Sequence, residues 1–482
     1  MRIVRNFIDG RYEEPSGDPR YPVYNPAFGE QIAAVAEAKR DDIEKAVDLA
    51  FDAQRKWMEI PVPERIKILF RLETLMWDSI DEISEITTKE HGKTFEEARG
   101  DTVRAIQNVE SAAAATYHIM GRSNKDIASG IDEELVREPL GVFAIISPFN
   151  FPLMIPFWFL PYAIALGNTV IIKPSEKTPL SVEKSMELLK KAGVPDNVVQ
   201  VVNGGKEAVD YILENKRIAG ISFVGSTPVA EYVYTKGTSM KKRVQAGASA
   251  KNFILVMPDA DLDKHMKNII GSFFGNAGER CLAGAVLITL PENHDTVLKK
   301  FVEHASRLKI GYGMEKGVEM GPLIRREHRK RVIEYIESGI GEGAKLLLDG
   351  RNYRNERYPE GFFLGPSVFD SITEDMRIAR EEIFGPVAGI MTADNFDHAL
   401  EIINRSRYGN ASSVYTNSGY YAREYAKRVK AGNIGINVGV AAPIAFYPFA
   451  GMKDSFFGDL HPQGGLDHIL FFTDSKVVIS RW

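Results

Sequence analysis

The chain has 482 residues, 44% of them hydrophobic and 26% charged, with a formal net charge of -5. A length prior of about 150 residues per domain predicts several domains, and the composition excludes a disordered or collagen-like chain. The weakly acidic balance gives no basic field for nucleic acid or an anionic membrane, so neither is expected as a partner. We therefore expect a globular protein whose ligand is a small molecule.

Cysteine usage and the start of the chain predict a cytoplasmic protein. The only cysteine, Cys281, cannot form an internal disulfide, and the first ten residues lack the apolar core of a signal peptide. Residues 139–172 carry no charged side chain and are long enough to cross a bilayer, but the four prolines between 148 and 161 interrupt them. This segment therefore reads better as strand, loop and buried helix than as a membrane span.

The first 121 residues begin with short strands and continue as helices. Apolar residues at three- and four-residue spacing predict the helices, with Asp41 as the N-cap of the first; they cover residues 41–57, 63–78, 80–90 and 101–117. Arg104 lies on the last of these helices among apolar and small neighbours, and an arginine on a solvated face is the alternative interpretation. Residues 123–137 are polar and contain a turn, which is typical of a hairpin arm.

Strands and helices then alternate up to residue 224. Strands are predicted at 141–146, 169–173, 198–202 and 220–224, with helices at 153–165, 181–192 and 206–214 between them. This order predicts a parallel, doubly wound sheet that binds its ligands at the carboxyl ends of the strands. Three polar stretches follow such ends: Ser147-Pro-Phe-Asn-Phe-Pro152, Lys173-Pro-Ser-Glu176 and Gly225-Ser-Thr227.

A second α/β series fills the rest of the chain. A strand at 252–257 runs into a capped helix that leads to Cys281, and further elements are expected at 286–290, 294–308, 388–391, 398–404, 412–416 and 420–430. Residues 469–479 have strand propensity, and an unpaired edge there would invite a second subunit.

The stretch from Phe274 to Gly284 makes Cys281 a candidate nucleophile. A thiol attacks as its thiolate, and the neighbouring Arg280 is a cation that could lower the cysteine pKa. Small residues around it let a backbone approach a ligand and free N–H groups to face an oxyanion; they are Gly275, Ala277, Gly278, Ala283 and Gly284. The alternative is an inert, buried cysteine that serves only as a small hydrophobe.

Five spaced motifs in this order resemble the aldehyde dehydrogenase superfamily over nearly the whole chain. They are Pro148-Phe-Asn-Phe-Pro152, Lys173-Pro-Ser-Glu176, Phe223-Val-Gly-Ser-Thr227, Gly278-Glu-Arg-Cys281 and Glu381-Glu-Ile-Phe-Gly-Pro386. Within the superfamily, Gly432-Asn-Ile-Gly-Ile-Asn437 and Ser455-Phe-Phe-Gly-Asp-Leu460 resemble the CoA-acylating methylmalonate-semialdehyde dehydrogenases.

The resemblance implies an aldehyde dehydrogenase-like α/β fold with two Rossmann-like domains and a β-arm oligomerisation element. Residues 1–121 and 141–247 would form the NAD-binding domain, and residues 248–440 the catalytic domain. Residues 122–140 and 441–482 would form the oligomerisation arm and the C-terminal strand of a homo-oligomer, a dimer or a tetramer.

The resemblance also implies the chemistry. Cys281 would attack the aldehyde, while the side-chain amide of Asn150 and the Cys281 backbone N–H stabilise the oxyanion. Hydride transfer to NAD would leave a thioester on the enzyme. Arg104 and Arg280 match positions that hold the substrate carboxylate in the methylmalonate-semialdehyde group, which suits bidentate guanidinium recognition. Malonate or methylmalonate semialdehyde would then yield acetyl-CoA or propionyl-CoA with loss of CO2.

The cofactor residues follow from the same resemblance. Glu176 can bind both hydroxyls of the adenosine ribose and would repel a 2′-phosphate, which favours NAD over NADP, and Lys173 can share this contact. Glu382 resembles a second ribose clamp, and Phe384 would lie at the nicotinamide. Residues 225–230 resemble the phosphate loop, with Ala230 where a glycine is usual. By analogy the same cleft is lined by Ser147, Phe149, Lys177, Ser226 and Ala248. Nine histidines without paired metal spacings give no reason to expect a metal.

The fate of the thioester separates the alternatives. Where hydrolytic members carry a glutamate that activates water, the aligned residue is Gln245, and an amide is no base near neutral pH. Coenzyme A as cosubstrate brings its own thiol, so acyl transfer is expected, unless Glu279 swings in as a base. A hydrolytic aldehyde dehydrogenase acting on another small aldehyde is the first alternative. A non-catalytic nucleotide-binding scaffold with a structural Cys281 is the second.

Overall fold

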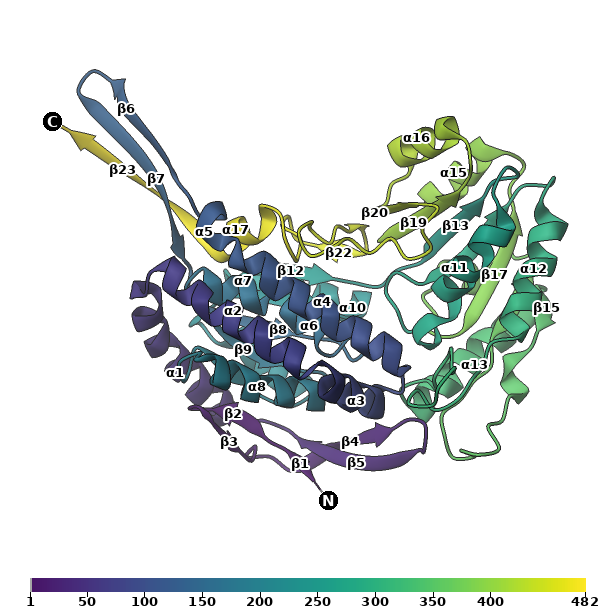
Figure 1. The fold of residues 1–482 in the computed structure, drawn as a ribbon, viewed down its shortest axis with the longest axis horizontal. Helices are drawn as coiled ribbons and strands as arrows, with labels where there is room; N and C mark the ends of the chain where they lie inside the picture. Colours follow the sequence, from purple (N-terminus) through teal and green to yellow (C-terminus); the bar gives the residue numbers. More distant parts are fainter. Residues whose placement is uncertain (1) are drawn as a thin grey trace.

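The computed structural model describes residues 2–482, which form two α/β halves and a projecting arm (Figure 1). Each half is built on one large, mostly parallel β-sheet with helices around it. The two sheets share no strand, and the chain passes from the first to the second between Gly247 and Asn252. The α/β class with two parallel sheets and a β-arm, as predicted from the sequence, is confirmed.

The first sheet has eight strands in the order β22-β12-β11-β8-β9-β10-β2-β3. Its five central strands are parallel: β12 (Arg243–Gly247), β11 (Ile218–Val224), β8 (Val142–Ile146), β9 (Thr169–Lys173) and β10 (Val199–Val201). Antiparallel strands extend both edges: β2 (Asn6–Ile8), β3 (Arg11–Glu13) and β22 (Phe456–Phe457).

Helices cover both faces of this sheet, and β8 shows how the sequence sorts the two cores. Val142, Ala144 and Ile146 pack on the side of α1 (Arg40–Glu59), α9 (Lys206–Glu214) and α10 (Thr227–Ser239). Phe143 and Ile145 pack on the other side. The helices there are α2 (Val62–Asp78), α3 (Ile80–His91), α4 (Phe95–Ala113), α7 (Leu160–Ala165) and α8 (Leu180–Ala192). A strand buried on both faces can be apolar throughout, as β8 is.

The second sheet has seven strands in the order β15-β16-β17-β14-β13-β19-β20, all parallel except β15. They are β13 (Asn252–Val256), β14 (Gly284–Thr289), β15 (Lys345–Leu348), β16 (Ser367–Asp370), β17 (Val387–Thr392), β19 (Ala411–Tyr415) and β20 (Asn433–Ile436). The helices are α11 (Leu262–Phe274), α12 (His294–Ser306), α13 (Arg326–Gly341), α14 (Arg377–Arg380), α15 (Phe396–Arg405) and α16 (Gly419–Arg428). One hydrophobic core joins them to the sheet.

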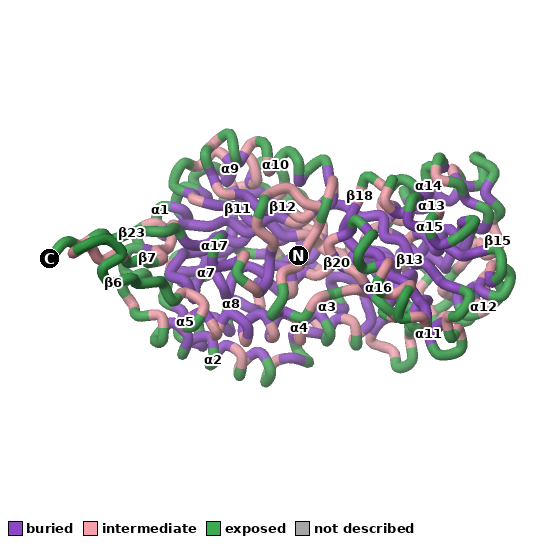
Figure 2. Tube along the Cα trace, turned by 90° about the horizontal axis from the view of Figure 1, so that it is seen from above, coloured by how far each residue is buried: buried purple, intermediate pink, exposed green. Residues whose placement is uncertain are grey.

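The arm is an antiparallel sheet of β6 (Arg122–Ala128), β7 (Ile131–Pro139) and β23 (Thr473–Arg481). It projects from the first half and is largely exposed along its length (Figure 2). Two small sheets complete the fold: β1 (Ile3–Val4), β5 (Glu30–Ala36) and β4 (Pro19–Asn25), and β18 (Tyr408–Gly409) with β21 (Met452–Lys453).

Several predicted boundaries were wrong. The tail is not a strand from Ile469, because α17 (Asp467–Phe472) buries Ile469, Phe471 and Phe472 before β23 begins. The helix predicted at 153–165 is split into α6 (Met154–Phe157) and α7, each of which contains a proline that cannot donate a helical hydrogen bond. Among the described residues, no helix has the length and apolar character needed to cross a membrane.

The ends of two predicted helices also differ. Asp41 lies inside the first turn of α1, and the N-cap is Lys39, whose backbone N–H donates to Asp42 at 2.9 Å. The helix predicted at 101–117 begins earlier, at Phe95, where Thr94 and Glu97 form a capping box. It ends at Ala113, and α5 (Ala115–His118) follows.

Candidate active site

Cys281 follows a left-handed turn at the end of α11. Asp261 caps this helix by accepting from Lys264 N at 3.1 Å, as predicted for a capped helix leading to the cysteine. After Phe274, the residues Asn276, Ala277 and Gly278 have φ values of 55°, 51° and 74°. The left-handed conformation costs about 1–2 kcal/mol for a residue with a side chain, so other contacts must hold the turn.

Hydrogen bonds from several elements hold the turn. The backbone N–H of Asn276 donates to the Glu97 carboxylate of α4 at 2.5 Å, and its side-chain amide donates to the Glu279 carbonyl at 2.9 Å. The carbonyl of Cys281 accepts from the side chains of Asn252 at 2.8 Å and Asn410 at 3.0 Å. The backbone on both sides of the reactive residue is therefore fixed by side chains from both halves of the chain.

The turn also packs against the segment that carries Glu382. A Cβ at Gly278 would lie 2.3 Å from the Gly385 carbonyl oxygen, so only glycine allows this approach of two backbones. Phe384 in that segment has a φ of 61°, and its carbonyl oxygen lies 2.7 Å from His328 Nε2. Residues 278 and 384 are thereby brought together although they lie far apart in the sequence.

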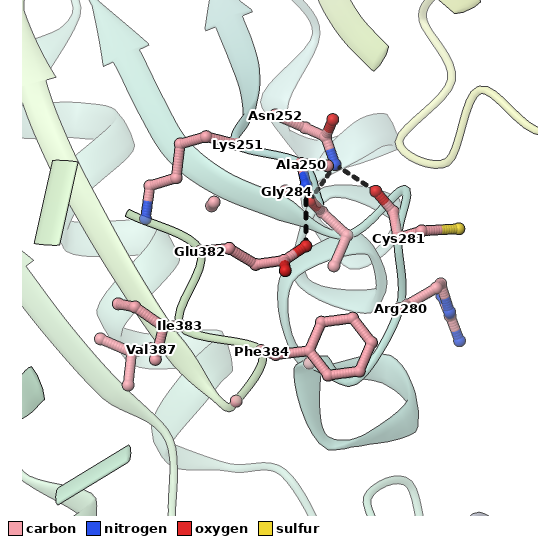
Figure 3. A pocket seen from close by; sticks show the side chains of 14 residues that line it. Ala250, Lys251, Asn252, Arg280, Cys281, Gly284, Glu382, Ile383, Phe384 and Val387 are labelled. Carbon is pink, nitrogen blue, oxygen red and sulfur yellow. Dashed lines mark hydrogen bonds between the residues drawn. The ribbon is translucent and has the colours of Figure 1, made fainter. Parts of the chain in front are cut away.

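Cys281 is half-buried and lines a small cavity of about 30 Å³ together with Lys251, Glu382 and Phe384. In Figure 3 the sulfur points away from Glu382, toward the side on which Arg280 lies. Burial and, to a smaller extent, the charge of Glu382 raise the pKa of Cys281 to about 12, although Arg280 acts to lower it. Arg280 therefore acts on the cysteine pKa in the expected direction, but burial outweighs it and the net pKa is raised.

Arg280 is itself engaged. One of its guanidinium nitrogens lies 3.2 Å from Glu97, another donates to the Gly271 carbonyl at 3.4 Å, and its buried Nε has no partner. Arg280 also borders a groove with Lys264, Lys267 and Val440. The Nε–H group of Arg280 is thus free to donate a hydrogen bond next to the cavity that Cys281 lines.

Arg104 is half-buried and lies in a different groove along α4. This groove is also lined by Arg99, Gln107, Ala442 and Ile444, and Arg104 donates to Gln107 at 3.1 Å. The structure does not bring the two arginines into contact, but both grooves border the same segment, residues 440–444. Arg104 and Arg280 therefore each line a groove that borders this segment.

Asn150, the predicted oxyanion donor, is buried beside the turn. The side-chain amide of Asn150 donates to the Glu279 carbonyl at 3.2 Å, and the backbone carbonyl of Asn150 accepts from Lys93 Nζ at 2.7 Å. An amide nitrogen carries two N–H groups, so one remains for a ligand. Asn150 and the residues before Cys281 are therefore in direct contact.

Glu279 and Gln245 are the residues that were considered for activation of a water, and both bind groups other than Cys281. Glu279 is fully buried, and one carboxylate oxygen accepts from Ile324 N at 3.3 Å and lies 3.5 Å from His328. Burial raises its pKa well above the ordinary range. Gln245 is buried on β12 and donates to Ser222 of the neighbouring strand at 2.8 Å. Its amide nitrogen is thus bound to the residue paired with it on β11, and not to a residue that lines the cavity at Cys281.

The predicted adenosine site lies at the carboxyl end of β9. Lys173 donates to the Gly204 carbonyl at 2.9 Å and lies 3.8 Å from the Glu176 carboxylate. Burial opposes ionisation of Glu176, but Lys173 and Lys177 outweigh it and lower the pKa of this carboxyl. Glu176 is therefore a partly exposed anion, as a hydrogen-bond acceptor for ribose hydroxyls requires.

The other predicted cofactor residues end neighbouring strands. Ser147 follows β8, and its buried hydroxyl has no partner. Ser226 is the exposed N-cap of α10 after β11, Ala248 follows β12, and Ala230 is buried inside α10. The carboxyl ends of these parallel strands meet at one edge, which is where such a sheet binds nucleotides.

Aromatic side chains connect this edge to the cysteine. The ring of Phe149 meets the edge of Phe384 at 5.8 Å between centroids and stacks on His91 at 5.9 Å, and Lys177 Nζ lies 4.6 Å from its centroid. Glu382 accepts from Ala250 N at 2.8 Å. A planar ligand group between the first sheet and Cys281 would therefore meet Phe149, Phe384 and Glu382.

Six residues that line or hold the site were not predicted from the sequence: Lys93, Glu97, Lys251, Asn252, His328 and Asn410. Glu97 could have been noticed, because Thr94-x-x-Glu97 is a capping-box pattern, although that pattern predicts only a helix start. The two asparagines carry no local signal. Within residues 2–482 no group of three or more His, Cys, Asp or Glu side chains could hold a metal ion.

Comparisons with known proteins agree with this geometry. The sequence model described as "Aldehyde dehydrogenase family" matches residues 12–478. A protein from Bacillus pumilus named malonate-semialdehyde dehydrogenase is 45% identical over 482 residues, which cover 100% of this chain and 99% of that protein. One from Geobacillus kaustophilus named malonate-semialdehyde dehydrogenase 2 is 43% identical, with the same coverage.

Two solved structures are similar over 100% of this chain. The methylmalonate-semialdehyde dehydrogenase from Oceanimonas doudoroffii has a TM-score of 0.98 and 38% sequence identity, with 99% of that chain covered. A protein from Sinorhizobium meliloti, described as a candidate methylmalonate-semialdehyde dehydrogenase and solved with NAD, has a TM-score of 0.98 and 40% identity, with 98% of that chain covered.

The raised pKa of Cys281 predicts how the free enzyme reacts with iodoacetamide. Only the thiolate is alkylated, and below a pKa of about 12 the thiolate fraction rises about tenfold for each pH unit. The inactivation rate of the ligand-free enzyme should therefore climb from pH 7 to pH 10 without levelling off. A plateau below pH 8 would instead mean that a thiolate is already formed at neutral pH.

Proposed function

The chain belongs to the aldehyde dehydrogenase family, and we propose that it oxidises malonate or methylmalonate semialdehyde with NAD and transfers the acyl group to coenzyme A. The family resemblance and the aldehyde dehydrogenase-like fold inferred from the motifs are confirmed. The observation that carries the proposal is the group of residues at Cys281: the buried side-chain amide of Asn150 donates to the carbonyl of Glu279, two residues before the cysteine, and Arg280 lines the same cavity as Cys281. The names of the relatives support the substrate class.

Cys281 supplies the nucleophile. Its sulfur bonds to the aldehyde carbon as its proton leaves to solvent, and the free N–H of Asn150 and the Cys281 backbone N–H stabilise the oxygen that becomes negative. When bound, NAD accepts the hydride that the adduct releases, which leaves an acyl thioester on Cys281. Because the backbone around the cysteine is fixed before the substrate arrives, these donors need little reorganisation.

The NAD site is supported by groups that fit its parts. Glu176 and Lys173 suit the adenosine ribose, and the exposed N-terminus of α10 at Ser226 suits a pyrophosphate. The unpartnered hydroxyl of Ser147 and the Phe149–Phe384 edge contact suit the nicotinamide half, with Glu382 as the second ribose acceptor. A carboxylate at position 176 would repel a 2′-phosphate, which favours NAD over NADP.

The second half of the reaction follows from the carboxylates around the cysteine, each of which already accepts at least one hydrogen bond. Glu382 accepts from Ala250 N, Glu97 from Asn276 N and Arg280, and Glu279 from Ile324 N. None of these hydrogen bonds is made to Cys281, so we assign none of the three carboxylates to the activation of a water. A thiol needs less help, so the sulfur of coenzyme A attacks the thioester, Cys281 leaves as the thiol, and the acyl group leaves on the new thioester. Loss of the substrate carboxylate as CO2 gives acetyl-CoA or propionyl-CoA.

Hydrolysis is the second candidate, and one observation favours it. The second carboxylate oxygen of Glu279 is buried without a partner. If this side chain rotates toward Cys281 after hydride transfer, it could accept a proton from a water. The product would then be a free acid.

We also propose a role for each part of the chain, including the arm. Residues 1–121 and 141–247 would bind NAD, residues 248–440 would carry the cysteine, and residues 122–140 with 441–482 would mediate assembly. The apolar side chains exposed on and beside β23 support a homo-oligomer, a dimer or a tetramer; they include Val477, Val478, Ile479 and Trp482.

The dependence on coenzyme A tests the proposed function. With malonate or methylmalonate semialdehyde and NAD but no coenzyme A, one NADH should form per active site and turnover should then become slow, because no group readies a water. Coenzyme A should restore continuous turnover with acetyl-CoA or propionyl-CoA as the product, identified by chromatography. Fast, continuous formation of a free acid without coenzyme A would support the hydrolytic enzyme instead.

Replacing Arg104 tests the substrate carboxylate. Arg104→Ala removes a charged hydrogen-bond donor worth about 1.5–3 kcal/mol, so kcat/KM for malonate semialdehyde should fall roughly ten- to hundred-fold while that for propanal changes little. Arg99→Ala is the matched control, because Arg99 lines the same groove of α4. Equal losses on both aldehydes, or a larger effect from Arg99→Ala, would remove Arg104 from the carboxylate site.

A further inference from the structure

Lys93, between α3 and α4, is a buried lysine whose ammonium group reaches the oxyanion loop. Its side chain is fully buried, and Nζ lies 2.7 Å from the Asn150 carbonyl oxygen, 3.3 Å from an Asp101 carboxylate oxygen and 4.1 Å from the centroid of the Phe151 ring. Burying an ammonium is unfavourable unless its partners compensate, and apolar side chains often stabilise such a position at least as well. A charged residue here therefore calls for a reason other than stability.

Asp101 of α4 binds both Lys93 and the backbone that follows Asn150. Its second carboxylate oxygen accepts from the backbone N–H of Met154 at 2.8 Å, and its side chain is fully buried as well. Lys93 and Asp101 thus hold Asn150 by its carbonyl and Met154 by its N–H. One ion pair therefore holds both ends of residues 150–154, which form the last part of the connection from β8 and the first residue of α6.

The ion pair of Lys93 and Asp101, called the clamp below, acts on Asn150, the residue proposed to donate to the substrate. With the Asn150 carbonyl fixed, the backbone from which its side chain extends is fixed too, and only two side-chain torsions remain. The amide end is already tied to the Glu279 carbonyl, two residues before Cys281, at 3.2 Å. The position of the remaining N–H relative to the sulfur therefore depends on where Lys93 holds the backbone.

We infer that Lys93 and Asp101 are positioning residues for the chemical step, which place the Asn150 amide where the oxyanion forms. The inference rests on the proposed function, because it assigns Asn150 to the aldehyde oxygen. A displacement of about 1 Å in such a group can reduce the rate on the order of a hundredfold. Loss of the clamp should therefore slow acylation of Cys281 and leave cofactor binding unchanged.

A second buried lysine provides a matched control. Lys242 is also almost fully buried and donates to two backbone carbonyls, those of Asn215 and Ile218. It precedes β12 and so lies at the amino ends of the parallel strands, opposite the edge that carries Asn150. Lys242→Met should lower the melting temperature without changing the acylation rate, which separates a general loss of stability from a loss of positioning.

The test compares the rate of the first NADH burst, at saturating NAD, in wild type, Lys93→Met, Lys242→Met, Asn150→Ala and the double variant Asn150→Ala/Lys93→Met. Lys93→Met should slow the burst roughly ten- to hundred-fold, equally for propanal and malonate semialdehyde, with an unchanged Kd for NAD. The double variant should be no slower than Asn150→Ala alone, because both changes remove the same interaction.

An unchanged burst in Lys93→Met, or losses that multiply in the double variant, would overturn the positioning role. If Lys93→Met does not fold because Asp101 is left unpaired, Lys93→Met/Asp101→Leu removes both charges and should show the same slow burst. A wild-type enzyme that gives no NADH burst with any aldehyde would contradict the proposed function itself, whereas the ratio of variant to wild-type rates reports only on the clamp.

Discussion

The backbone turn before Cys281 is a conformation that its own residues do not favour, and the rest of the site depends on the contacts that hold it. Asn276 and Ala277 are left-handed although neither is a glycine, and Gly278 packs directly on the Gly385 carbonyl. Glu97 of the first half binds the start of the turn, and Asn252 and Asn410 of the second half bind the Cys281 carbonyl. The reactive sulfur can keep its place only when both halves are folded against each other.

One face of α4 organises the site. Glu97, Asp101 and Arg104 are spaced by four and three residues and therefore lie on the same side of the helix. Glu97 binds the turn and Arg280, Asp101 binds Lys93 and the loop after Asn150, and Arg104 lines the outer groove. Arg104, Arg280 and Asn150, which are proposed to bind the substrate carboxylate and the oxyanion, are thus all carried by α4 or held by its side chains. This shared support keeps the distances between them constant.

The sequence predicted the strands and the residues that end them, because β8 and β9 are continuous apolar runs followed by polar motifs. It did not predict Lys93, whose contact with Asn150 joins residues 57 apart. In sequence Lys93 and Asp101 look like ordinary charges at a helix start, and only the tertiary structure reveals that they are buried. The net pKa of Cys281 was not predictable from the sequence for the same reason. Arg280 does act to lower this pKa, but its guanidinium also binds Glu97, and burial together with Glu382 raises the pKa by more.

The central claim is that Cys281 carries the acyl group between the aldehyde and a second thiol, and trapping that intermediate tests it most directly. A reaction of the enzyme with NAD and malonate semialdehyde, quenched in acid during the first turnover without coenzyme A, can be digested and analysed by mass spectrometry. The account predicts an acyl adduct on the peptide that contains Cys281, in an amount equal to the NADH formed, which disappears when coenzyme A is added before the quench. NADH without an adduct on that peptide, or an adduct lost equally fast without coenzyme A, would contradict it.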